Sequence, residues 1–491
     1  MQKRIVFYTL GCKLNQYETE GIAAAFSDKD FSVSEYPEED TGDIFIINTC
    51  TVTSKSEQKA RRIIRKIARE NPGKPIIVTG CYTQVDKEAV DSMAEEVIAL
   101  PLSQKHILMS LPEKIASYPD EDIGPDIIRE LIAKNNLQPH DHMVQKKSDI
   151  QLSYNGLSSH VSGQQSLGLS SAIMDAEYPP FDKRFSYVFS NPRFHTRAFL
   201  KIQDGCSHSC SYCRVTIARG DSVSLSPDIV LQRITELEKS GVEEIVLTGV
   251  NIAQYRHSGY DLGKLLLRIF TNTENIRIRL SSFENEAISD SFIQALEHPR
   301  LCPHFHISLQ SGSERILRAM KRWYTPRDIT QLAQLFRQKK EKPFVSGDVI
   351  VGFPGETDSD FADTLSLVEK LSFSDLHIFR YSQRPGTAAY NFTPQIPQRV
   401  AAEREKELRQ LIKKLSQNYL ESQRNTTVRI IREDDITING KRFISGISEN
   451  YLTVIIPYKE SKTITATSFP VKIKATYPSM PRTVLGEIKE Q

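Results

Sequence analysis

The chain has 491 residues, with 39% apolar residues, 25% charged residues and a formal net charge of +2. This composition predicts an ordinary folded protein of about three domains, at roughly 150 residues per domain. It excludes a chain that is basic or acidic overall, so any contact with nucleic acid must be local. No run approaches the ~18 apolar residues of a membrane span, and residues 5–10 are too short a run for a signal peptide. We expect a cytoplasmic protein with no membrane contact.

The first hundred residues alternate strands with helices. Apolar runs bounded by turn residues predict strands at residues 4–10, 43–48 and 75–79. Helices near 18–27 and 54–70 separate them, which implies an α/β fold with a doubly wound parallel sheet. Each strand is followed by a cysteine, and the carboxyl ends of such strands open onto one crevice. We therefore predict that Cys12, Cys50 and Cys81 form one cluster site, in preference to three separate buried thiols.

Residues 101–191 carry the least information. Helices are expected near 127–135, whereas 148–172 is rich in Ser, Gly and Gln and lacks an apolar period. We expect a linker or insertion that is partly disordered, around 158–171. Three histidines of this region are expected to be solvated: His140, His142 and His160.

Three cysteines follow in a C-x3-C-x2-C pattern: Cys206, Cys210 and Cys213. Soft sulfur ligands this close in sequence favour one iron–sulfur cluster or a zinc ion. Three ligands leave one iron of a 4Fe-4S cluster open, whereas structural zinc normally has four protein ligands. Zinc completed by His208 is the alternative, although the spacing is not that of paired C-x2-C ligands. The remaining cysteine, Cys302, is expected to be a small buried side chain.

From residue 197 the pattern predicts an incomplete (βα)6 barrel. Its strands are expected at residues 197–203, 244–248, 277–281, 305–310, 347–351 and 375–381. The helices between them are expected at residues 228–239, 262–270, 290–297, 327–339 and 360–371. Barrels of this kind place their chemistry on loops after the strands, and Cys206 follows the first strand.

The last part follows a charged helix at 403–421. Short β-rich segments at residues 427–431, 451–456 and 471–475 predict a small antiparallel β-barrel. From Arg424 the chain has 11 Lys or Arg against 7 Asp or Glu, a local net charge of +4. This suits RNA phosphates, with solvated surface charge as the equal alternative.

These motifs resemble the radical S-adenosylmethionine (SAM) superfamily, in which an aromatic residue such as Tyr212 precedes the third cysteine. Apart from 101–191, the chain resembles the radical SAM methylthiotransferases. Residues 9–20 (TLGCKLNQYETE) are similar to the branch that modifies N6-threonylcarbamoyladenosine in tRNA. Other similar motifs are residues 247–251 (LTGVN), 280–284 (LSSFE), 306–313 (HISLQSGS), 348–356 (DVIVGFPGE) and 381–387 (YSQRPGT). Two departures are the loss of expected arginines after Arg219 and of a proline after Glu284.

The resemblance implies four regions. They are an N-terminal methylthiotransferase domain (1–100), an insertion or linker (101–191), a radical SAM barrel with its connecting helix (192–422) and a TRAM-like RNA-binding β-barrel (423–491).

The resemblance also implies the activity, a transferase reaction. The enzyme would convert N6-threonylcarbamoyladenosine at tRNA position 37, 3′ of the anticodon, to its 2-methylthio derivative. Two 4Fe-4S clusters and SAM are the implied cofactors: one cluster on Cys206, Cys210 and Cys213 binds SAM, and an auxiliary cluster lies on the other triad. The implied partners are the tRNA anticodon stem-loop, an electron donor such as flavodoxin or ferredoxin, and a sulfur donor that the sequence does not identify.

Five residues are candidates for SAM contact: Gly249, Glu284, Gln310, Ser311 and Gly352. The glycines would let the backbone approach the ligand, and the polar residues lie at strand ends. Structural roles are equal alternatives for all five, and are favoured for Asp348 and Ser382. Tyr451 and Tyr458 are candidates to stack on anticodon-loop bases, with core packing the alternative.

Three other functions stay open. The chain could act on isopentenyladenosine tRNA, or it could be a radical SAM enzyme without sulfur insertion, which would not need the N-terminal triad. A non-enzymatic RNA-binding protein with two structural metal sites would bind metal without cleaving SAM.

Overall fold

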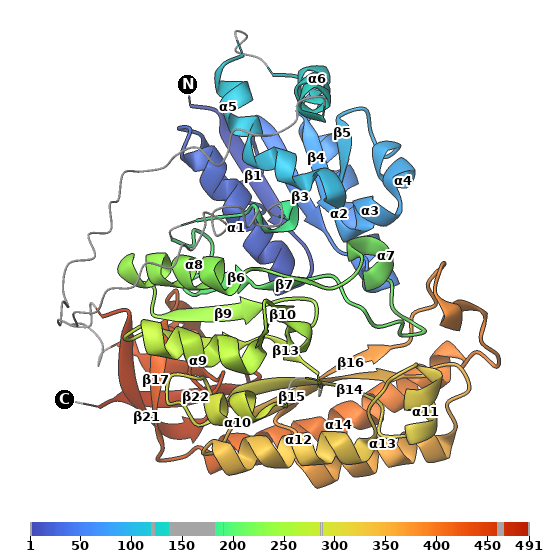
Figure 1. The fold of residues 1–491 in the computed structure, drawn as a ribbon, viewed down its shortest axis with the longest axis vertical. Coiled ribbons are helices and arrows are strands. Elements are labelled where there is room, and N and C mark those ends of the chain that lie inside the picture. Colours follow the sequence, from blue (N-terminus) through green and yellow to red (C-terminus); the bar gives the residue numbers. More distant parts are fainter. Residues whose placement is uncertain are drawn as a thin grey trace, which may run out of the picture.

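The computed structural model describes residues 2–118, 123–136, 182–189, 191–284, 286, 288–458 and 466–489. The disorder expected around 158–171 and the histidines at 140, 142 and 160 lie outside this part of the chain. Figure 1 shows an N-terminal sheet stacked on a central barrel, with a second, smaller barrel at the C-terminal end. Within the described residues, no helix has the length and apolar character needed to span a membrane.

The N-terminal sheet is wholly parallel, in the order β2-β1-β3-β4-β5. Its strands are β1 (Arg4–Thr9), β2 (Ser32–Glu35), β3 (Ile44–Thr49), β4 (Ile76–Gly80) and β5 (Val97–Pro101). The three predicted strands and the doubly wound arrangement are confirmed. The prediction missed β5 and the short, partly exposed edge strand β2. The strand order reverses between β1 and β3, and the carboxyl ends at such a point form a ligand crevice.

Helices cover both faces of this sheet because strand side chains alternate. Ile5 and Phe7 of β1 pack with α1 in one core, whereas Val6 packs with α2 in the other. The helical segments are α1 (Lys13–Ser27), α2 (Ser54–Glu70), α3 (Cys81–Val85), α4 (Lys87–Asp91), η1 (Leu102–Met109), α5 (Leu111–Ala116), α6 (Pro125–Asn136) and η2 (Lys183–Phe185). The bounds of α2 are as predicted. The helix α1 begins earlier than predicted, directly after Cys12, which forms no side-chain cap.

The central barrel contains the six predicted parallel strands and a short additional one, β13, divided between two sheets. The first has the order β12-β9-β6, and the second has the order β13-β14-β15-β16. These strands are β6 (Ala198–Lys201), β9 (Glu244–Thr248), β12 (Arg277–Leu280), β13 (Ser282–Phe283), β14 (His304–Gln310), β15 (Phe344–Val351) and β16 (Asp375–Arg380). Because β6 and β16 each pair with one neighbour, the barrel is open between them, and the incomplete (βα)6 prediction is confirmed.

Helices surround the barrel and connect it to the last domain. They are α8 (Pro227–Lys239), α9 (Leu262–Asn272), α10 (Asp290–Leu296), α11 (Glu314–Ala319), α12 (Pro326–Lys339), α13 (Asp358–Leu371) and the long α14 (Gln398–Ser422). After β6, the chain forms β7 (Gln203–Asp204), α7 (Val215–Arg219) and β8 (Val223–Ser224). The cysteine loop at 206–213 therefore lies between β7 and α7, directly after the first barrel strand.

The C-terminal barrel has the sheet order β17-β21-β22-β20-β19-β18 and is closed by pairing of β17 with β19. Its strands are β17 (Thr427–Arg432), β18 (Ile436–Ile438), β19 (Lys441–Ser448), β20 (Thr453–Pro457), β21 (Ser468–Thr476) and β22 (Thr483–Ile488). The predicted small antiparallel barrel is confirmed, with one parallel pairing within it, that of β20 with β22. This pairing joins strands distant in sequence, which local patterns do not reveal.

Five charged side chains form a buried ion network between the N-terminal sheet and the central barrel: Glu18, Lys105, Lys201, Asp204 and Arg219. Glu18 accepts hydrogen bonds from Lys105 Nζ at 2.6 Å and Lys201 Nζ at 2.8 Å. Arg219 Nη1 lies 3.0 Å from both Glu18 Oε1 and Asp204 Oδ1. Burial acts against the charged form of Glu18, but Arg219 and the two lysines hold its pKa well below the usual value. Three positive and two negative charges leave this network with one excess positive charge.

Replacing Glu18 by glutamine should destabilise the protein, because three cations would remain buried with one carboxylate among them. Removing one partner of a buried ion pair costs about 3–5 kcal/mol. We expect a clearly lower midpoint of denaturant-induced unfolding. The control is Glu39→Gln, which removes an exposed carboxylate 3.1 Å from Arg4 and should leave the midpoint nearly unchanged. Equal midpoints for the two variants would contradict a structural role for the network.

Candidate cluster sites and the central cavity

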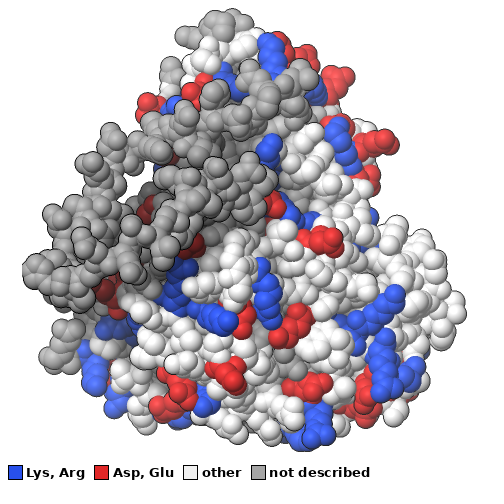
Figure 2. All heavy atoms as spheres, in the orientation of Figure 1, with Lys and Arg blue, Asp and Glu red and all other residues white. Residues whose placement is uncertain are grey.

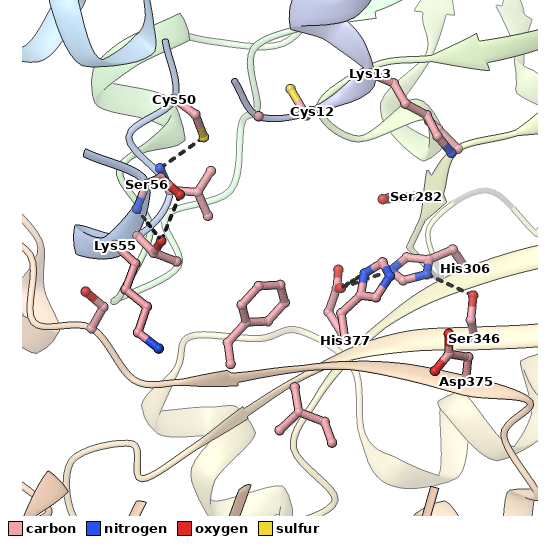
Figure 3. A pocket seen from close by; sticks show the side chains of 18 of the residues that line it. Cys12, Lys13, Cys50, Lys55, Ser56, Ser282, His306, Ser346, Asp375 and His377 are labelled. Carbon is pink, nitrogen blue, oxygen red and sulfur yellow. Dashed lines mark hydrogen bonds and ion pairs between the residues drawn. The ribbon is translucent and has the colours of Figure 1, made fainter. Parts of the chain in front are cut away.

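A cavity of about 1050 Å³ lies where the N-terminal sheet, the central barrel and the C-terminal barrel meet. The N-terminal sheet contributes Cys12, Lys13 and Cys50 to its wall, and the C-terminal barrel contributes Tyr451 and Arg482. The central barrel contributes the ends and inner faces of its strands, among them Gly249, Ser282, His306, Asp348 and His377. Figure 3 shows Cys12 and Cys50 on one side of this space and the paired histidines across from them. The site therefore depends on all three parts of the fold.

The N-terminal triad comes together as the strand ends predicted. Cys12 precedes α1, Cys50 follows β3, and Cys81 begins α3. Burial, with the neighbouring Cys12 and Cys81, raises the pKa of Cys50 to about 12. Gly11 has a φ of +110°, and a Cβ there would lie 2.7 Å from Cys50 Cβ. Glycine is thus required for the turn that brings Cys12 beside Cys50.

The buried ion network extends to this triad through Arg219. Its Nε donates to Cys81 Sγ at 3.3 Å, while Nη2 donates to Asn15 Oδ1 at 2.9 Å. Burial disfavours the guanidinium charge, yet Asp204, Cys81 and Glu18 raise the pKa of Arg219 well above its usual value. The excess positive charge of the network therefore faces thiols that must become thiolates to bind metal. An anionic metal–thiolate cluster fits this environment.

The second triad lies on the loop after β7. Burial is the main cause that raises the pKa of Cys206 to about 12 and that of Cys213 to about 11. The neighbouring thiol of Cys210 also acts to raise both pKa values. Arg322 donates from Nη1 to Cys210 Sγ at 3.2 Å and from Nη2 to Glu284 Oε1 at 2.9 Å. The other oxygen of Glu284, Oε2, is buried without a hydrogen-bond partner, and His208 Nε2 lies 3.6 Å from it. A buried carboxylate oxygen beside this triad is suited to receive a ligand's ammonium group.

The spacing of the sulfurs bears on the zinc alternative. Among the described residues, the groups of three ligand atoms within 4.8 Å of one another contain no cysteine. Thiolates around one zinc ion lie closer, roughly 3.8 Å apart for a Zn–S bond of about 2.3 Å. His208 groups with Glu284 and Glu286 and not with the cysteines. Neither triad, as the described residues lie, forms such a compact zinc-ligand group.

The five SAM candidates occupy different surroundings and stay predictions. Gly249 lines the cavity, and Glu284 lies beside the second triad with its free oxygen. Gln310 ends β14 with a φ of +61°, a conformation that non-glycine residues rarely adopt. Ser311 is buried and accepts a hydrogen bond from Ser313 N at 3.1 Å. Gly352 packs against α14, where a Cβ would lie 2.6 Å from Ala401 Cβ, so its contacts are structural.

Sequence reasoning missed a polar cluster on the barrel strands that lines the cavity. Asp348 Oδ1 lies 3.0 Å from His306 Nε2 and 3.2 Å from His377 Nδ1 (Figure 3). His306 Nδ1 in turn lies 2.9 Å from Ser346 Oγ. Although burial acts to raise it, the two histidines hold the pKa of Asp348 well below its usual value. The available signal was polar residues at alternate positions of three otherwise apolar strands.

Comparison with known proteins gives matches to two family models. Residues 200–368 match the Radical SAM superfamily, and residues 4–100 match Uncharacterized protein family UPF0004. The chain is 38% identical over 472 residues to threonylcarbamoyladenosine tRNA methylthiotransferase MtaB of Treponema pallidum, covering 91% of this chain and 93% of that protein. The Bacillus subtilis protein of the same name is 33% identical over 483 residues, covering 96% and 94%. The chain belongs to the threonylcarbamoyladenosine tRNA methylthiotransferase family.

This methylthiotransferase chain is also similar to a neighbouring family. A tRNA-2-methylthio-N(6)-dimethylallyladenosine synthase of Nitratiruptor is 28% identical over 459 residues, covering 92% of each chain. The lower identity places the chain nearer to the threonylcarbamoyladenosine family.

Iron counting tests the two cluster sites of this methylthiotransferase. After anaerobic reconstitution, we expect about eight iron atoms per chain, two cubes of four. Cys50→Ala and Cys213→Ala should each retain about four, because each removes a thiolate from one triad. The control is Cys302→Ala, which removes a buried cysteine away from both triads and should retain about eight. About four irons in the unaltered protein, or bound zinc, would contradict two clusters.

Proposed function

We propose that this protein converts N6-threonylcarbamoyladenosine at tRNA position 37 to its 2-methylthio derivative, as a radical SAM methylthiotransferase. The observation that carries the proposal is the N-terminal triad, which places Cys12 and Cys50 on the cavity wall in addition to the separate triad at 206–213, in a chain that matches two relatives named for this activity over more than nine-tenths of its length. A radical SAM enzyme without sulfur insertion needs one triad. The convergence of the additional, N-terminal triad therefore supports sulfur insertion.

The cofactors are two 4Fe-4S clusters and SAM. Cys206, Cys210 and Cys213 hold the cluster that binds SAM, and the N-terminal triad holds the auxiliary cluster. When bound, these groups supply radical cleavage of SAM, sulfur for carbon 2 of the adenine, and a methyl group from a second SAM. The protein contributes binding, orientation and exclusion of water.

Particular side chains have defined roles in this arrangement. Glu284 Oε2 would accept a hydrogen bond from the SAM ammonium group, while Arg322 holds the other oxygen of Glu284 and donates to Cys210 Sγ. Arg219, which belongs to the buried ion network, likewise donates a hydrogen bond to Cys81 Sγ. Both arginines place positive charge and a hydrogen bond at a thiolate, which tunes the metal site through its surroundings.

The tRNA is the macromolecular substrate, and its binding must be local. Figure 2 shows acidic and basic side chains interspersed over the visible face, in keeping with the small net charge. We assign RNA contact to residues 423–491 as a TRAM-like domain, because its local charge is positive and Tyr451 and Arg482 reach the cavity from it. Three further points belong to this proposal. They are domain boundaries at residues 100, 191 and 422, a cytoplasmic location, and reduction of the clusters by flavodoxin or ferredoxin.

Nucleoside mass spectrometry tests the proposal in cells that lack the protein. We expect the 2-methylthio derivative of threonylcarbamoyladenosine to disappear from tRNA and to return when the unaltered gene is restored. Cys50→Ala should fail to restore it, yet the purified variant should still cleave SAM to 5′-deoxyadenosine, because the SAM site is intact. Cys213→Ala should lose both activities. Loss of methylthiolated isopentenyladenosine instead would favour the neighbouring family's substrate, and normal product from Cys50→Ala would contradict the sulfur role of the N-terminal triad.

A further inference from the structure

One corner of the cavity gathers positive charge around a single aromatic ring, that of Tyr451. Four cationic groups lie near its centroid: Arg482 at 5.2 Å, Arg279 at 5.3 Å, Lys13 at 5.8 Å and Arg197 at 6.0 Å. Tyr451 itself has a φ of +65° and stacks on His304, with ring centroids 4.1 Å apart. A tyrosine in this rare backbone conformation is held by its surroundings, as often occurs at ligand sites.

The acidic partners of this corner are already engaged by the arginines. Arg279 forms two hydrogen bonds to Glu244, at 2.7 and 3.0 Å. Arg197 lies 3.3 Å from Glu433, and Arg482 lies 3.6 Å from Asp375. In the described part of the chain, Lys13 Nζ has neither an ion pair nor a hydrogen bond. It lies 5.8 Å from the centroid of the Tyr451 ring. Lys13 is thus the cation with unused capacity for an anion.

The pKa shifts of Tyr451 and His304 agree with an excess of positive charge at this corner. Burial acts to raise the pKa of Tyr451, but Lys13 and the three arginines lower it overall. Burial, and then Arg279 and Lys13, hold the pKa of His304 well below its usual value, so that imidazole stays neutral. The corner therefore holds four cationic side chains against three carboxylates, and burial lowers the pKa of the unpaired one, Lys13.

We propose that Lys13, on the cavity wall with Tyr451 and Arg482, binds the carboxylate of the threonylcarbamoyl group and thereby selects this substrate. This inference rests on the proposed function. Lys13 directly follows Cys12, so the subsite adjoins the triad that serves carbon 2 of the adenine. In adenine, carbon 2 and carbon 6, which carries N6, flank the same ring nitrogen. A base with carbon 2 at Cys12 therefore directs its N6 substituent toward Lys13.

Selectivity follows from the chemistry of the two substituents. A threonylcarbamoyl group ends in a carboxylate, which pairs with the ammonium of Lys13. An isopentenyl group is uncharged and apolar, so binding it would cover Lys13 without giving the ammonium an anion. Leaving a buried charge unpaired is unfavourable, so such a site rejects the neutral analogue.

A tRNA phosphate is the other anion that Lys13 could meet, and binding measurements separate the two. Cluster-loaded protein is titrated at constant salt with three anticodon stem-loop RNAs of one sequence. They carry threonylcarbamoyladenosine, its carboxamide analogue or unmodified adenosine at position 37. We expect the unaltered protein to prefer the carboxylate over the carboxamide by on the order of tenfold or more. Lys13→Gln should lose this preference and bind the unmodified RNA as before.

The matched control is Lys55→Gln, since Lys55 lines the same cavity on its other side (Figure 3) and should leave the preference intact. An equal loss of affinity for all three RNAs in Lys13→Gln would assign Lys13 to a phosphate and overturn the proposal. Equal binding of carboxylate and carboxamide by the unaltered protein would also overturn it, even if the Lys13 variant failed to fold. If the protein methylthiolated only isopentenyladenosine RNA, the proposed function itself would be refuted. That result differs from the results that overturn the role of Lys13, so the two failures are distinguishable.

Discussion

The arrangement of this protein depends on one buried guanidinium, that of Arg219. It reaches Glu18 of helix α1 beside the N-terminal sheet, Asp204 of the central barrel and the sulfur of Cys81. Buried charges are tolerated only when they are paired and hydrogen-bonded, so the two parts cannot shift without leaving a charge unpaired. The contact that fixes their relative position is thus also a contact to a cluster ligand, which couples the fold to the geometry of the site.

This coupling explains why the cavity is shared among three parts of the chain. The N-terminal sheet presents its crevice at the reversal of strand order, and the barrel is open between β6 and β16. The two openings face one another across the cavity, and the C-terminal barrel closes one corner with Tyr451 and Arg482. No part contains a complete site alone. Under the proposed function, a base bound here would touch the wall with Cys12 and Cys50, the barrel strands and the cationic corner together.

The sequence predicted those features that arise from local pattern. The strand at 244–248 and the helix at 54–70 match β9 and α2 in their bounds, because apolar periodicity and turn residues specify both. The N-terminal triad was found because parallel strands share one carboxyl edge. The cluster around Asp348, the cations around Tyr451 and the parallel pairing of β20 with β22 join distant segments. Such contacts depend on register and packing, which no local pattern contains.

The two cysteine triads have matching arginines but different electrostatic surroundings. Arg219 belongs to a buried network with one excess positive charge, whereas Arg322 pairs with a single carboxylate, Glu284, and is neutral as a pair. Fixed positive charge stabilises added negative charge, so the surroundings of Cys81 would favour a reduced cluster more than those of Cys210 would. Under the proposed function, strongly reducing chemistry is therefore better placed at the second triad, and storage of anionic sulfur at the first. Charge as well as position in the fold then distinguishes the proposed roles of the two triads.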